Sequence, residues 1–180
     1  MSWLSQYRVQ ARYNQWFNQK LYAAAATLTD EERKQDRGAF FKSIHRTLNH
    51  LLLTDSIWLL RFTQDQGFFP RDAKGRIIPL TGLAQELYAD FDELSQKRVQ
   101  RDQDIVAFAA SLSEESLNAD ISYKTTAGVE FKHPLWQALG HLFNHQTHHR
   151  GQITTLLMQL SVDPGVTDVI FMLRDEGVPG

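Results

Sequence analysis

The chain of 180 residues has no cysteine, seven histidines, 19 lysines and arginines, and 21 aspartates and glutamates, which gives a formal net charge of −2. Without cysteine it can form no disulfide, no iron–sulfur cluster and no thiolate zinc site, so any metal must be bound by imidazole or oxygen. The length predicts one domain over residues 1–180, and a composition that is 42% hydrophobic and 22% charged is typical of a globular protein.

Charge and hydropathy argue against two classes of partner. The basic residues are spread among a similar number of acidic ones, whereas nucleic-acid binding needs clustered lysine and arginine. No segment approaches the roughly 18 uninterrupted apolar residues of a membrane span. The first residues lack the basic-then-apolar pattern of a secretory signal, so we expect a cytoplasmic protein that binds neither nucleic acid nor membrane.

Four segments have the periodicity of amphipathic helices. The first begins near Trp3 and breaks at Thr29, and a long polar connection over residues 67–82 separates the second from the third. The remaining predicted helices cover about residues 39–62, 83–112 and 133–160.

Two smaller elements are expected near the fourth helix. Between residues 120 and 132 the apolar period changes to two, which predicts a small β-hairpin. Thr167 or Asp168 can cap a short helix that extends through Leu173. The sequence therefore predicts an all-α four-helix bundle with a small β-hairpin before the fourth helix and a short C-terminal helix.

Two histidines lie on the core-facing stripe of the fourth helix. At about 100° per residue, His145 and His149 fall in line with Leu142 and Ile153. Burying two imidazoles without partners would cost about 1–3 kcal/mol each, so something must bind them. Their i, i+4 spacing lets both bind one metal ion, although most such pairs are ordinary surface histidines.

The second helix offers a third metal ligand. His50 lies there in a narrow polar strip with Ser43, Thr47, Thr54 and Arg61, and the surrounding positions are mostly apolar. A polar strip on an apolar helix indicates a cleft or an internal site. His50 can therefore face the histidine pair across the bundle.

Other side chains near these positions are candidates for orienting the ligands or lining a pocket. Thr47, Thr54 and Gln152 lie beside the histidines on the helical wheels, although helix threonines often bond only to the carbonyl four residues back. The candidates for lining the pocket are His148, Arg61 and Trp58. The alternative for the two polar residues is an exposed position, and the alternative for Trp58 is a place in the apolar core.

We expect the remaining histidines, and several arginines, at the surface. His45 and His133 are interpreted as solvent-exposed or capping residues, and His141 as a residue at the rim of the site. Arg98 and Arg101 interrupt the apolar face of the third helix, so they either recognise an anion or, as the commoner case, lie on a solvated face.

The segments with the candidate ligands resemble the DinB/YfiT-like metalloprotein superfamily. HLFNHQTHHRGQITTLL, residues 141–157, resembles its late signature, and TLNHLLLTDSIWLLRF, residues 47–62, resembles its earlier one. YNQWFNQKLY at 13–22 and DVIFMLR at 168–174 are also similar. The resemblance thus extends along nearly the whole chain.

The resemblance implies an up-down-down-up bundle that is commonly a homodimer. It also implies one divalent metal ion per chain, often zinc or nickel, bound by three histidines that match His50, His145 and His149. Some members transfer a low-molecular-weight thiol such as bacillithiol, mycothiol or glutathione onto an electrophile, and others isomerise maleylpyruvate. Three imidazoles leave coordination positions open, which is typical of catalytic sites.

Two functions follow as hypotheses. The first is a metal-dependent enzyme of the thiol S-transferase type, or a related hydrolase or isomerase, in which a metal-activated thiol or water attacks a small-molecule electrophile. The alternative is a non-catalytic, metal-stabilised dimeric bundle that acts as a stress-response binding module. An open metal site beside a cleft favours the enzyme.

Overall fold

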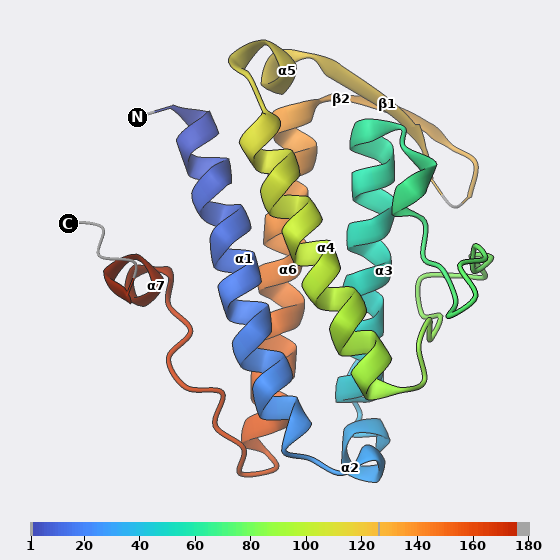
Figure 1. Ribbon diagram of the computed structural model, residues 1–180, viewed down its shortest axis with the longest axis vertical. Coiled ribbons are helices and arrows are strands. Elements are labelled where there is room, and N and C mark those ends of the chain that lie inside the picture. Colours follow the sequence, from blue (N-terminus) through green and yellow to red (C-terminus); the bar gives the residue numbers. More distant parts are fainter. Residues whose placement is uncertain (1, 126, 176–180) are drawn as a thin grey trace.

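The computed structural model describes residues 2–125 and 127–175. Four long helices lie side by side and form a bundle (Figure 1). They are α1 (Trp3–Ala26), α3 (Ile44–Thr63), α4 (Phe91–Ser111) and α6 (Leu135–Met158). α1 and α6 run in one direction and α3 and α4 in the other, so the connectivity is the expected up-down-down-up arrangement. The predicted all-α four-helix bundle is confirmed.

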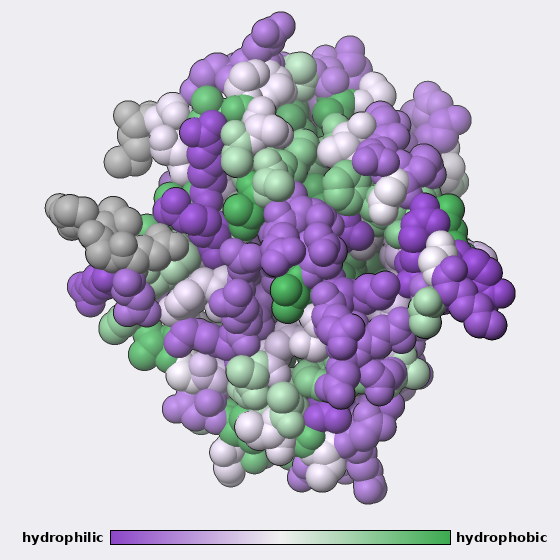
Figure 2. All heavy atoms as spheres, in the orientation of Figure 1, coloured by the Kyte–Doolittle hydropathy of each residue, from purple (hydrophilic) through white to green (hydrophobic). Residues whose placement is uncertain are grey.

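Each long helix packs mainly against two others. α1 contacts α4 and α6, and α3 contacts the same two helices. The pair α3 and α6 is antiparallel, as Figure 1 shows, so residues from the middle of each face one another. No helix of the described residues has the length and apolarity needed to cross a bilayer. On the face shown in Figure 2, hydrophobic residues form small groups between hydrophilic ones.

Shorter elements lie at the ends and along the side of the bundle. The predicted hairpin is confirmed as an antiparallel pair in which Tyr123 is opposite Phe131, and it lies across the end of the bundle near the start of α6 (Figure 1). The predicted C-terminal helix is also present. These elements are α2 (Asp30–Lys34), the 3-10 turn η1 (Gln66–Phe68), α5 (Glu114–Asn118), β1 (Asp120–Lys124), β2 (Glu130–Pro134) and α7 (Val169–Asp175).

Two of the predicted helix starts are wrong. Residues 39–43 form a turn with an isolated bridge, and α3 begins only after Ser43, whose hydroxyl accepts a hydrogen bond from the Arg46 amide. Residues 83–90 are not helical, and α4 begins after its cap Asp90. The prediction of a single domain over residues 1–180 remains a prediction, and residues 1, 126 and 176–180 lie outside the described part.

A buried asparagine on α3 explains why residues 83–90 are not helical. The side-chain oxygen of Asn49 accepts hydrogen bonds from the backbone amides of Leu87 and Tyr88, both at 2.9 Å. Its Nδ2 donates to the Tyr88 carbonyl at 3.1 Å. Because these backbone groups bond to α3, they cannot form the i to i−4 bonds of a helix. The segment is therefore a non-helical strap bonded to α3.

Replacing Asn49 with alanine should lower the free energy of unfolding by about 2–3 kcal/mol, because buried backbone groups of the strap lose their partners. Amide hydrogen exchange at Leu87 and Tyr88 should become faster by more than at any core helix position. Urea denaturation and exchange measured by NMR provide the readouts. Asn118→Ala, at an exposed site on α5, is the control, and unchanged exchange at Leu87 would contradict the structure.

A polar layer divides the apolar core into two clusters. Arg98 of α4 forms ion pairs with Asp55 of α3 at 2.6 Å and with Asp102 at 2.8 Å, and all three side chains are at most 3% exposed. Asn14 and Asn18 of α1 donate to Asp102 at 3.1 and 2.9 Å. Charges at this depth need such partners because desolvation is costly.

The fourth helix joins this polar layer through two side chains. Gln146 donates its amide to Asp55, and Arg150 donates to the Asn14 side chain at 2.8 Å. The layer therefore connects all four long helices at the same level. The expectation that Arg98 and Arg101 lie on a solvated face is wrong, because both residues are buried.

Candidate metal centre

Three histidines from two antiparallel helices converge beside the polar layer. His50 comes from α3, and His145 and His149 come from α6. One nitrogen of each lies within 4.8 Å of the others, and the Nε2 atoms of His50 and His145 are 3.1 Å apart. The structure thus brings together the three residues that the sequence pattern singled out, and among the described residues they form the one such group.

Hydrogen bonds at the outer nitrogens fix two of the imidazoles. Nδ1 of His50 donates to the Leu83 carbonyl at 2.8 Å, and Nδ1 of His149 donates to the Gln152 side-chain oxygen at 2.8 Å. The proton on Nδ1 leaves a lone pair on Nε2 of each ring, and these lone pairs could bind a metal ion.

Burial keeps the three imidazoles neutral. It lowers the pKa of His50 to about 4 and that of His145 to about 3, and it also lowers the pKa of His149 below its usual value. Because each pKa lies below neutral pH, the rings are uncharged under physiological conditions. Neutral imidazole is the form that binds a metal ion.

The nitrogens of His50 and His145 are close enough to share a metal ion. Two ligands bound at about 2.0–2.1 Å can be no more than about 4.2 Å apart, and the 3.1 Å between His50 and His145 satisfies this limit. The third nitrogen lies within 4.8 Å of the other two. The donor set, three imidazoles, suits zinc, nickel, copper or iron, so the residues fit a divalent ion.

The buried Nδ1 of His145 has no hydrogen-bond partner among the described residues. Because His50 keeps its proton on Nδ1, the proton of the Nε2–Nε2 hydrogen bond belongs to His145. To hold a metal ion through Nε2, His145 would need the neutral tautomer with its proton on Nδ1.

Two residues that the sequence analysis missed complete this site. The Phe41 ring stacks on His50 with centroids 3.8 Å apart and also meets His149 edge-on. Leu83, in the strap, contributes the carbonyl that orients His50. Phe41 could have been noticed as an apolar residue just before the cap of α3, but no local pattern indicates which backbone carbonyl bonds to His50.

The side chains predicted to orient the ligands behave differently from one another. Gln152 accepts from His149 and, through its amide nitrogen, contacts Nε2 of the exposed His148 at 3.2 Å. The hydroxyls of Thr47 and Thr54 bond to the backbone and not to the imidazoles. Their hydroxyls donate to the carbonyls four residues back, the common bond of helix threonines.

The remaining histidines lie outside the cluster. The expectation that His45 is a surface or capping residue is wrong, because it is wholly buried and its Nε2 bonds to the Tyr88 carbonyl at 2.9 Å. The strap that residues 83–90 form covers it. His141 is exposed one turn from His145, and His133 lies in β2.

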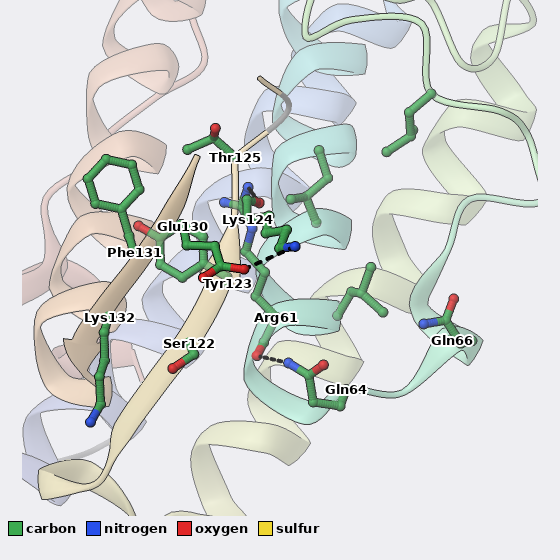
Figure 3. A pocket seen from close by; sticks show the side chains of 13 residues that line it. Arg61, Gln64, Gln66, Ser122, Tyr123, Lys124, Thr125, Glu130, Phe131 and Lys132 are labelled. Carbon is green, nitrogen blue, oxygen red and sulfur yellow. Dashed lines mark hydrogen bonds and ion pairs between the residues drawn. The ribbon is translucent and has the colours of Figure 1, made fainter. Parts of the chain in front are cut away.

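Two adjoining cavities lie along α3. The smaller, about 320 Å³, is lined by Leu53, one turn beyond His50, and by Leu83. It shares Ile57 and Leu80 with a cavity of about 740 Å³, which is lined by the end of α3 and the hairpin (Figure 3). None of the three histidines lines either cavity. The smaller cavity is connected to the cluster through Leu83, whose carbonyl bonds to His50, and the larger one lies toward the hairpin.

The up-down-down-up bundle with three converging histidines defines a class of helical protein that could bind a metal ion. The chain belongs to the DinB family, whose model matches residues 4–177. It is 25% identical over 168 residues to protein DinB of Bacillus subtilis (strain 168), covering 91% of this chain and 93% of that protein.

Solved structures share the fold. A DinB-like protein from Bacillus cereus ATCC 10987 is similar with a TM-score of 0.57 at 21% identity, over 83% of this chain and 90% of that one. YfiT from Bacillus subtilis, described as a probable metal-dependent hydrolase with an unusual four-helix bundle topology, gives a TM-score of 0.58 at 17% identity. That match covers 89% of this chain and 90% of YfiT.

Proposed function

We propose that this protein is a metal-dependent enzyme in which a divalent ion bound by His50, His145 and His149 activates a low-molecular-weight thiol or water. The activated group attacks an electrophilic small molecule. The observation that carries the proposal is the convergence of three neutral imidazoles, one of which bonds to Leu83 in the wall of a cavity. Three protein ligands leave at least one coordination position open, as in catalytic sites. The description of YfiT as a probable metal-dependent hydrolase also supports it.

The residues around the ion would have different roles. When bound, the ion lowers the pKa of a thiol or water and so supplies a nucleophile at neutral pH. Leu83 and Gln152 hold two of the imidazoles in the required tautomer through their oxygen atoms. Phe41 covers His50 on one side, which excludes water there. The substrate would then enter from the side of the smaller cavity.

The proposal is tested with untagged protein that has been stripped of metal and reloaded with zinc or nickel. One assay follows conjugation of monochlorobimane with bacillithiol or glutathione, and another follows hydrolysis of p-nitrophenyl acetate. At least one rate should rise about 100-fold or more with metal, because metal activation is worth several kcal/mol, and His50→Ala should abolish the rise.

If the protein binds metal stoichiometrically and accelerates neither reaction, the alternative of a metal-stabilised, non-catalytic bundle gains support. In that case His50→Ala would lower the melting temperature without changing any chemistry. The homodimer, the cytoplasmic location and the choice between zinc and nickel remain predictions.

A further inference from the structure

A partly buried arginine lies in the wall of the larger cavity. The guanidinium of Arg61 is 4.6 Å from the centroid of the Trp58 ring and 4.4 Å from that of Tyr123, so two aromatic rings hold it. One of its nitrogens donates to the Lys124 carbonyl at 3.1 Å. Figure 3 shows the side chain between the end of α3 and the hairpin.

Arg61 has no acidic partner within the described residues. The carboxylate near it, Glu130, is paired with Lys124 at 3.0 Å, as the dashed line in Figure 3 shows. Lys132, which is also on β2, is paired with Asp120 at 3.0 Å. Arg61 is therefore the cation of this cavity whose charge no described side chain balances.

Arg61 is partly desolvated and has no described carboxylate to balance its charge. This costs free energy unless a ligand bonds to the guanidinium. Burial lowers the pKa of Arg61 below its usual value, which reflects this cost. A planar guanidinium with free N–H groups matches carboxylate and phosphate oxygens. The cavity volume of about 740 Å³ falls within the range of sites for small organic ligands.

We infer that this cavity binds a small organic anion with a planar apolar group, whose carboxylate or phosphate is held by Arg61. The planar group packs against Tyr123 and Phe131 of the hairpin, and the anionic head takes the N–H groups that Arg61 leaves free. That the same molecule reacts at the histidines rests on the proposed function. The shared wall of Ile57 and Leu80 connects the two places.

The test measures binding of three matched probes by calorimetry. 2-Naphthoate and 2-naphthyl phosphate carry the anionic head, and 2-naphthamide replaces it with a neutral group of similar shape. Either anion should bind about tenfold or more tightly than the amide, because charge-assisted hydrogen bonds to arginine are the strong ones. The anion that binds more tightly identifies the head group.

Variants identify the group responsible. Arg61→Gln should remove the preference for the anion, and Arg61→Lys should keep part of it, with circular dichroism checking that each variant is folded. Lys132→Gln is the matched control, since it removes a charge from the same cavity that Asp120 already balances. Equal affinity for all probes, no measurable binding, or a preference that survives Arg61→Gln would overturn the inference.

Each measurement is repeated with metal-stripped and metal-loaded protein. Binding that persists without metal supports the anion site even if no metal-dependent reaction is found. Binding that requires metal and is unaffected by Arg61→Gln would place the ligand at the histidines and would overturn the inference. The two proposals therefore fail separately.

Discussion

Replacing His145 with alanine is expected to reduce bound zinc or nickel from about one ion per chain to a trace. Loss of a partner that only orients a ligand weakens metal binding 10–100-fold, so loss of the ligand itself should cost more than about 100-fold. His149→Ala and His50→Ala should behave alike, because each removes one of the converging nitrogens. Elemental analysis of untagged protein after dialysis provides the measurement.

His133→Ala is the control for these variants. His133 lies on the hairpin, away from the three converging nitrogens, and should leave the metal content unchanged. His45→Ala should also leave it unchanged but should lower the stability, because His45 is wholly buried and bonded to the strap. Equal metal content in the His145, His149 and His133 variants would contradict the proposed site.

Replacing Arg98 with methionine is expected to lower the free energy of unfolding by about 3–5 kcal/mol at pH 7. Arg98 forms ion pairs with two buried carboxylates, Asp55 and Asp102. Removing one member of a buried ion pair leaves an unbalanced charge in the core, which is far more costly than losing an exposed pair. Urea denaturation gives the free energy directly.

The loss should be smaller at pH 5. Burial raises the pKa of Asp102 to about 6 against the opposing effect of Arg98, and without Arg98 the pKa must rise further. The unfolded-state pKa is near the usual 3.8, so the folded state takes up a proton as the pH falls. As the pH falls from the folded-state pKa to the unfolded-state pKa, protonation of Asp102 therefore stabilises the folded protein progressively.

An exposed ion pair provides the control for Arg98→Met. Arg76 lies 2.6 Å from Asp72 and its side chain is 71% exposed, so Arg76→Met should change the stability by less than about 1 kcal/mol. Adding Asp102→Asn to Arg98→Met should restore part of the lost stability. If Arg98→Met and Arg76→Met are equally stable, the polar layer does not contribute as described.

The sequence predicted the bundle and the histidine cluster because both depend on helical periodicity. His145 and His149 share a face of one helix, and the polar strip around His50 marks a face of another. Phase on each helix determines which side chains face inward, and a bundle then brings those faces together. The hairpin was also predictable from a periodic pattern, because its apolar residues alternate with a period of two.

Contacts between distant segments could not be predicted in this way. Leu83 and Leu87 have the spacing of a helix, and the competing contact comes from Asn49, which lies 38 residues before Leu87. A helical wheel shows that Arg98 interrupts an apolar face, but the partner Asp55 lies on another helix. Both errors concern polar partners that the fold supplies and the local pattern does not contain.

The distance along the chain between the metal-binding groups determines when the centre can form. His50 and His145 are separated by 95 residues, and α6 is the last long helix to be synthesised. Because folding during translation proceeds from the N-terminus, the nascent chain exposes a single imidazole of the triad until α6 has emerged. A metal ion that needs all three histidines would therefore be bound only after α6 has emerged and docked against α3.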